Sequence, residues 1–142
     1  MAGNFQVREN FKVGEKASMT REITASDITS MAEITGDFNP IHIDEEFARK
    51  SRFQGRIAHG VLSAGLISAV LGMHLPGPGA IFLRQTLKYL NPVRVGDTLT
   101  AQVEVSKWRP DRKIITLETL CLNQDGDTVL EGEAVLLIEP ID

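Results

Sequence analysis

The sequence predicts an α+β fold in which an antiparallel β-sheet wraps around one central apolar helix. The chain has 142 residues, which suits a single domain spanning 1–142. Residues 57–83 contain no Asp, Glu, Lys or Arg, but their apolar part is shorter than the roughly 20 residues that cross a bilayer. Beyond residue 79 the apolar spacing changes from a helical period to alternation, and short turns make the strands antiparallel.

The first half of the chain is predicted to be mainly helical. A short strand is expected over 17–23, and a helix over 25–35 has its apolar residues on one face. Thr24 or Ser26 is suited to cap the start of this helix. Gly36 is suited to end it in the left-handed conformation.

An apolar helix over about 58–73 follows one or two helical turns over 44–50. Because it carries no charge on any face, we expect it to be buried on all sides. Small residues recur at every fourth position and allow another backbone to approach closely: Gly60, Ala64, Ser68 and Gly72.

Four long strands are expected in the second half of the chain. Apolar and polar residues alternate over 98–105, which indicates a half-buried strand. The runs 113–122 and 128–138 flank Asp125-Gly126, a typical hairpin turn. In the earliest of these strands four residues are expected to share one face: Ile81, Leu83, Leu87 and Tyr89.

Composition excludes several classes of partner and compartment. Fifteen Lys and Arg against nineteen Asp and Glu give a net charge of −4, so no basic stripe favours nucleic acid. The single cysteine, Cys121, has no partner for a disulfide or a zinc site, and the charged N-terminus lacks the apolar core of an export signal. We therefore expect a cytoplasmic protein with no metal site and no membrane span.

A carboxylate, an amide and an imidazole fall within six positions, at Asp37, Asn39 and His42. Gly36 and Pro40 predict a turn here, on which the three side chains can converge. A carboxylate beside an imidazole is suited to hold and activate a water molecule. The same residue types are also typical of a helix-capping loop, and the spacing alone does not decide between the two.

Gly60 lies where the apolar helix begins, and the first amides of a helix lack intrahelical partners and carry partial positive charge. With no side chain to block it, the Gly60 N–H can polarise a carbonyl and stabilise an enolate formed from it. The alternative is that Gly60 only permits close packing.

Two segments together resemble the MaoC-like hydratases, specifically the (R)-specific enoyl-CoA hydratases: Gly-Asp-Phe-Asn-Pro-Ile-His at 36–42 and Arg-Ile-Ala-His-Gly-Val-Leu-Ser at 56–63. Residues 75–79 and 91–97 also match that family around its first long strand. The resemblance implies a hot-dog fold, a homodimer or larger assembly with the acyl pocket at the subunit interface, and no metal or redox cofactor. It implies hydration of a trans-2-enoyl-CoA to the (R)-3-hydroxyacyl-CoA. Because a single domain has room for the acyl pocket beside one central helix only, we expect short to medium acyl chains.

Individual roles follow from the resemblance. Asp37 and His42 match the catalytic pair, Asn39 the orienting amide and Gly60 the donor to the thioester oxygen. Ser63 matches a position that borders the acyl pocket. His59 matches a family histidine that we interpret as structural, and His74 is expected at the surface.

The sequence leaves open the roles of two residues, and it allows two alternative functions. Arg84 and Lys88 share one face of a strand and can meet the phosphates of coenzyme A, although solvated strand charges explain them equally well. A hot-dog acyl-CoA thioesterase is an alternative function, but the Asn-Pro-x-His element argues against it. A non-catalytic acyl-CoA-binding protein would need neither Asp37 nor His42.

Overall fold

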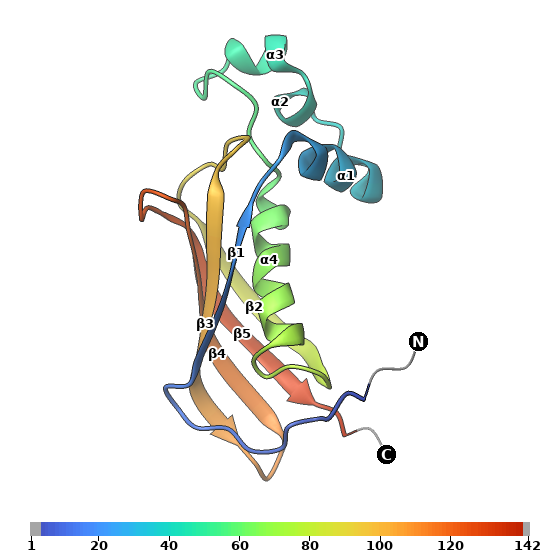
Figure 1. Ribbon diagram of the computed structural model, residues 1–142, viewed down its shortest axis with the longest axis vertical. Coiled ribbons are helices and arrows are strands. Elements are labelled where there is room, and N and C mark those ends of the chain that lie inside the picture. The colour runs from blue at the N-terminus through green and yellow to red at the C-terminus, as the bar shows by residue number, and fades with distance from the viewer. Residues whose placement is uncertain (1–3, 141–142) are drawn as a thin grey trace.

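The computed structural model describes residues 4–140 and places α4 along one face of a curved antiparallel sheet (Figure 1). Its elements are β1 (Lys16–Glu22), α1 (Ala25–Thr35), α2 (Pro40–Ile43), α3 (Glu45–Arg49), α4 (Gly60–Met73), β2 (Ala80–Tyr89), β3 (Thr98–Arg109), β4 (Ile114–Leu122) and β5 (Thr128–Ile138). They follow the predicted order, except that the short helix α2 stands where only a turn was expected. The strand order across the sheet is β1-β3-β4-β5-β2, and all pairs are antiparallel. The predicted α+β hot-dog arrangement is confirmed.

The core lies between α4 and the sheet face that it covers. Alternate residues of neighbouring strands pair on this inner face, as in the row that joins Ala101, Cys121 and Leu130. All three are fully buried, and burial raises the pKa of the Cys121 thiol to about 11, so that it stays protonated at neutral pH. The thiol is therefore a core group and not a reactive nucleophile.

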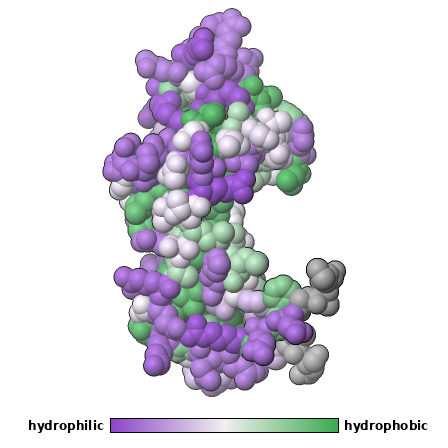
Figure 2. Space-filling view, viewed as in Figure 1, coloured by the Kyte–Doolittle hydropathy of each residue, from purple (hydrophilic) through white to green (hydrophobic). Residues whose placement is uncertain are grey.

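The prediction that α4 is buried on all sides is wrong for the single chain. Ile67, Val70 and Leu71 face the sheet and are at most 1% exposed, whereas Val61 and Met73 are more than half exposed. Figure 2 shows apolar side chains gathered over the middle of this face of the molecule, between two hydrophilic ends. The helix is apolar all round, but the sheet covers only one of its faces.

Strand β2 departs from the predicted alternation because of a β-bulge between Phe82 and Arg84. Ile81 pairs with Leu137 on the outer face of the sheet, whereas Leu87 and Tyr89 face α4. The expectation that Ile81 and Leu83 share a face with Leu87 and Tyr89 is therefore wrong, since the extra residue reverses the direction of the side chains.

Helices α1, α2 and α3 lie together beyond one end of the sheet, away from the chain termini (Figure 1). A capping box starts α1: Thr24 Oγ1 accepts from the Asp27 N–H at 3.1 Å, and Asp27 Oδ2 accepts from the Thr24 N–H at 3.0 Å. This second bond, together with Arg21, lowers the pKa of the Asp27 carboxyl. Gly36 ends the helix at a φ of 81°, as predicted.

None of the helices within residues 4–140 is long and apolar enough to cross a membrane.

Candidate active site

His42 lies in α2, and its imidazole is buried beside the segment that leads into α4. Its Nδ1 lies 2.8 Å from the main-chain oxygen of Ile57. A carbonyl oxygen only accepts hydrogen bonds, so Nδ1 carries the proton and donates it. In the neutral ring the lone pair is therefore on Nε2.

Asp37 lies in the loop between α1 and α2 with its side chain half exposed. Its Oδ1 accepts from the Asn39 N–H at 3.1 Å. The Asn39 side chain caps α2, since its Oδ1 accepts from the Ile41 N–H at 3.2 Å. Asn39 thus holds the carboxylate of Asp37 through its main chain and starts the helix of His42 with its side chain.

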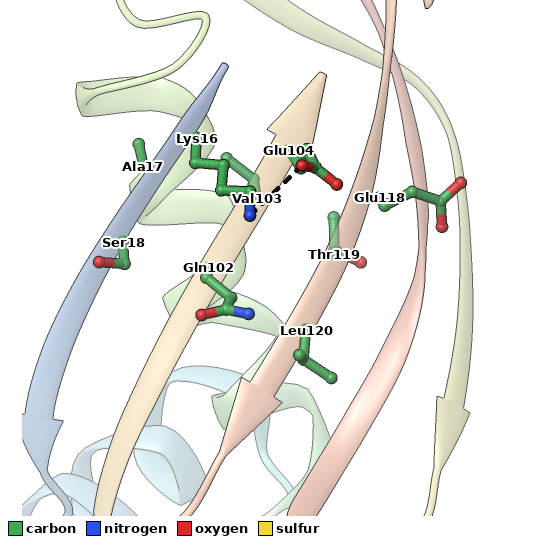
Figure 3. Close-up of a pocket in the computed structure, with 9 residues that line it drawn as sticks. All are labelled: Lys16, Ala17, Ser18, Gln102, Val103, Glu104, Glu118, Thr119 and Leu120. Atoms are coloured by element: carbon green, nitrogen blue, oxygen red, sulfur yellow. Dashed lines mark ion pairs between the residues drawn. The ribbon is translucent and has the colours of Figure 1, made fainter. Parts of the chain in front are cut away.

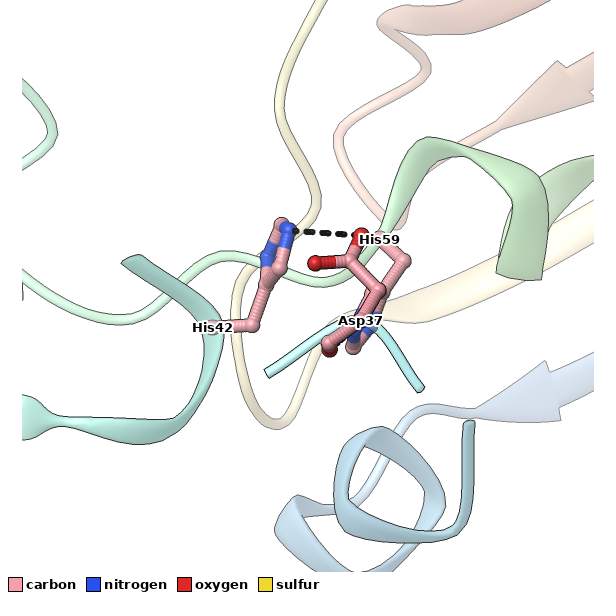
Figure 4. Close-up of side chains that lie close together, drawn as sticks. All are labelled: Asp37, His42 and His59. Atoms are coloured by element: carbon pink, nitrogen blue, oxygen red, sulfur yellow. Dashed lines mark hydrogen bonds and ion pairs between the residues drawn. The ribbon is translucent and has the colours of Figure 1, made fainter. Parts of the chain in front are cut away.

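The other carboxylate oxygen of Asp37 faces the His42 ring, with 3.9 Å between Oδ2 and Nε2 (Figure 4). This separation is too long for a direct hydrogen bond. Both atoms are acceptors when the ring is neutral, and a water molecule has two O–H groups with which to donate to both. The structure therefore brings Asp37 and His42 together as a pair suited to bind one water.

His59 lies directly against this pair and is only 2% exposed. Its ring stacks on the His42 ring, with centroids 3.9 Å apart and planes inclined by 27°. Its Nε2 lies 2.9 Å from the main-chain oxygen of Asp37 and, by the same argument, donates to it. Its Nδ1 is buried and finds no hydrogen-bond partner among the described residues.

Ligand atoms of Asp37, His42 and His59 lie within 4.8 Å of one another, close enough to compare with a metal site. The two imidazoles are stacked, with planes inclined by 27°. Each ring donates one N–H to a main-chain carbonyl, which leaves His42 Nε2 and His59 Nδ1 as acceptors. Histidines that bind metals also donate their second N–H in this way, so the absence of a metal site stays a prediction from the sequence.

Gly60 is the first residue of α4, and the first turn of that helix contains no acidic residue. A Cβ atom at residue 60 would lie 2.8 Å from Cε1 of Tyr89. The close-packing explanation of Gly60 is thus supported by the Tyr89 contact. This contact does not exclude that the Gly60 N–H polarises a carbonyl, because the N-terminal amides of α4 still lack intrahelical acceptors.

A cavity of about 360 Å³ opens beside the pair, and its walls include His42, Gly60 and the buried Ser63. Most of the other lining residues were not assigned to a site from the sequence, among them Arg52 and Tyr89. Arg52 is exposed, its guanidinium lies 5.2 Å from the centre of the Phe53 ring, and no carboxylate among the described residues pairs with it. No local pattern marked either residue, because both reach the cavity only through the folding of distant segments.

Arg84 and Lys88 are not brought to this cavity. In β2 they pair with Val135 and Glu131 on the outer face of the sheet. The cavity lies on the inner side, where Tyr89 contacts the start of α4. Within one chain the sheet therefore separates these two cations from Asp37 and His42.

The outer face carries a separate hollow of about 330 Å³ across β1, β3 and β4 (Figure 3). Lys16 forms an ion pair of 3.5 Å with Glu104 there. Glu118 lies directly opposite Glu104 on the next strand. The hollow contains no histidine or cysteine, so the candidate chemistry stays at the inner site.

Comparison with known proteins gives one consistent result. The model of the MaoC like domain matches residues 9–124. An (R)-specific enoyl-CoA hydratase of Rhodospirillum rubrum is 48% identical over 130 residues, covering 92% of this chain and 90% of the relative. A 3-hydroxybutyryl-CoA dehydratase of Methylorubrum extorquens is also 48% identical over 130 residues, covering 92% and 82%. The solved (R)-hydratase of Aeromonas caviae, involved in PHA biosynthesis, has a TM-score of 0.88 at 41% identity, covering 92% of this chain and 99% of that one.

The hydrogen bonds of the two buried histidines predict opposite tautomers. Above about pH 8, where imidazoles are normally neutral, we expect His42 to be protonated on Nδ1 and His59 on Nε2. Long-range ¹H–¹⁵N correlation spectra of histidine-labelled protein measure this directly. The exposed His74 serves as the reference for a solvated ring. A His42 ring protonated on Nε2 would contradict the site geometry, because that tautomer leaves Nδ1 unable to donate to Ile57.

Proposed function

The chain belongs to the MaoC-like domain family, and from this membership and the site geometry we propose that it is an (R)-specific enoyl-CoA hydratase. It is a hydro-lyase that adds water to a short- to medium-chain trans-2-enoyl-CoA. The observation that carries the proposal is the placement of two acceptors, Asp37 Oδ2 and His42 Nε2, 3.9 Å apart, with His42 lining the cavity. No metal or redox cofactor takes part in the proposed reaction.

The water is held by Asp37 and His42 and attacks C3 of the enoyl group. As the C3–O bond forms, one water proton passes to the pair. The π electrons of the C2–C3 double bond form a new double bond between C1 and C2, and those of the carbonyl move onto the thioester oxygen. The enolate then collapses, and the pair returns one proton to C2. Atoms and charge balance, because the pair ends in the protonation state in which it began.

The Gly60 N–H, at the N-terminus of α4, donates a hydrogen bond to the thioester oxygen. Negative charge develops on this oxygen only in the enolate, so the partial positive charge of the helix end stabilises the transition state more than the substrate. Ser63, one turn further along α4, lines the acyl cavity, and Asn39 keeps the Asp37 carboxylate in place. The short- to medium-chain preference is supported by the size of this cavity and by the four-carbon group in the name of the 3-hydroxybutyryl-CoA relative.

The function is tested by assaying hydration over a ladder of trans-2-enoyl-CoA chain lengths with chiral analysis of the product. We expect the (R)-3-hydroxyacyl product. Asp37→Asn and His42→Gln should each reduce kcat about 10²–10⁴-fold, because each removes one of the two groups that handle the proton. Both variants should unfold at temperatures close to that of the wild type, since they preserve size and, at Asp37, the hydrogen bond to Asn39.

Two results would contradict this assignment. Near-native turnover of either variant would show that the substituted residue only caps the loop and takes no part in catalysis. Release of free thiol from saturated acyl-CoA, without hydration of any enoyl-CoA, would instead identify a thioesterase.

A second test asks whether Gly60 lacks a side chain so that the substrate can approach its N–H, or so that the Tyr89 ring can pack there. We expect Gly60→Ala to lower kcat/KM about 10²-fold by displacing the thioester oxygen. The double variant Gly60→Ala/Tyr89→Ala removes the 2.8 Å conflict and is compared with Tyr89→Ala alone. Gly65→Ala is the matched control in the same helix, since a Cβ there meets nothing within 4 Å.

If the absence of a side chain at Gly60 serves the substrate, Gly60→Ala should lower kcat/KM by the same factor in the Tyr89→Ala background as in the wild type. Full recovery in the double variant would show that Gly60 only makes room for the tyrosine ring.

We also propose that two copies associate along β2, with each copy closing part of the other's acyl cavity. Strand β2 is an edge strand and pairs only with β5. Three of its consecutive apolar residues are 40–52% exposed: Ile81, Phe82 and Leu83. The uncovered face of α4 adds Val61 and Met73, and apolar surface of this extent is typical of an interface.

Sedimentation at micromolar concentration is expected to show a dimer. Leu83→Lys should shift the population towards monomer and lower activity, because it places a charge on the edge of β2. Val13→Lys is the matched control, since Val13 is 69% exposed and lies before β1. A fully active wild-type monomer would contradict the proposed assembly.

A further inference from the structure

His59 contacts both members of the proposed catalytic pair and directly precedes Gly60. It is the residue immediately before α4, so its main chain precedes Gly60. Its ring contacts His42 by stacking, and its Nε2 binds the main chain of Asp37. Through these contacts one side chain connects α4 to both members of the catalytic pair.

Each contact of His59 restricts a different motion. The bond of 2.9 Å to the Asp37 oxygen holds the loop between α1 and α2 against the start of α4. The stacked ring limits tilting of the His42 imidazole, whereas the bond to Ile57 fixes only one end of that imidazole. The separation between Asp37 Oδ2 and His42 Nε2 therefore depends on both His59 contacts.

The chemical state of His59 fits a supporting role and not proton transfer. Its Nε2–H is used by the Asp37 carbonyl, and its Nδ1 is buried and has no hydrogen-bond partner within residues 4–140. A buried nitrogen without a hydrogen bond is costly. An apolar side chain would fill the same space without this cost. Filling space therefore does not by itself explain a histidine at this position.

We propose that His59 is a positioning residue for the hydration reaction, which sets the distance and orientation between Asp37 and His42. The inference rests on the proposed function. It differs from the purely structural role expected from the sequence, because the predicted consequence of losing His59 is a misaligned pair within an intact fold. Misplacement of reacting groups by about 1 Å lowers turnover about 10²-fold.

Three substitutions separate the two contacts. His59→Ala removes both, His59→Phe keeps a ring for stacking on His42, and His59→Gln keeps an amide donor near the position of Nε2. We expect kcat to fall about 10²-fold in the alanine variant, with KM changed much less. The phenylalanine and glutamine variants should each recover part of this loss. His74→Gln is the matched control, because His74 is exposed at the other end of α4.

A double-substitution cycle distinguishes positioning from general stability. Once Asp37→Asn has removed the carboxylate, replacing His59 by alanine should cost little more, because the two act through the same pair. Fully additive losses would overturn the proposal. So would an alanine variant with wild-type kcat, or losses that follow the unfolding temperature equally in all three variants.

Histidine ¹⁵N spectra give a second readout that needs no activity. The His42 signal should keep its Nδ1-protonated form in His59→Phe and shift towards a mixture of tautomers in His59→Ala. An unchanged His42 signal in the alanine variant would overturn the positioning role. If the wild-type protein hydrates no enoyl thioester, the proposed function fails, and the spectra still decide whether His59 orients His42.

Discussion

The burial of one face of α4 against the curved sheet is the constraint on which the site depends. Ile67, Val70 and Leu71 are at most 1% exposed, and burying such side chains contributes about 1.5–3 kcal/mol each. Because this contact fixes the helix along its length, it also fixes where its first residue, Gly60, lies. The positive end of the helix is therefore placed by the core and not by the loops around it.

The proposed catalytic pair reaches this helix end from a different part of the chain. Asp37 and His42 belong to the segment of α1 and α2, which lies beyond one end of the sheet (Figure 1). Contacts that close the gap include the His42 bond to Ile57, the His59 bond to Asp37 and the stack of the two imidazoles. The main chain of α2 is held as well, by bonds from Arg56 Nε to the His42 oxygen and from the Ile57 N–H to the Ile41 oxygen. These contacts hold the segment at the place where we propose that water is activated.

Local patterns in the sequence correctly predicted the features that depend on interactions between residues close together in the chain. The cap at Thr24, the left-handed Gly36 and the strand alternation of β3 depend on near neighbours, and each was found as expected. The bulge at Leu83 was missed, because an extra residue is accommodated by pairing with β5, some fifty positions away. The contact between Gly60 and Tyr89 was missed for the same reason. The uncovered face of α4 was also not predicted, since composition alone does not show how far a sheet extends around a helix.

The site could be located from so few residues because its supports are mostly main-chain atoms. The carbonyl of Ile57 fixes the His42 ring, the carbonyl of Asp37 accepts from His59, and the N–H of Asn39 holds the Asp37 carboxylate. Every residue supplies these groups, so the supporting positions place little demand on side-chain identity. Chemical specificity is then concentrated at a few positions. These are the residues that present a carboxylate or an imidazole, and the glycine that has no side chain. The short motif around 36–42, once its family resemblance is recognised, therefore predicts the reacting groups, whereas the contacts that align them become visible only in the folded chain.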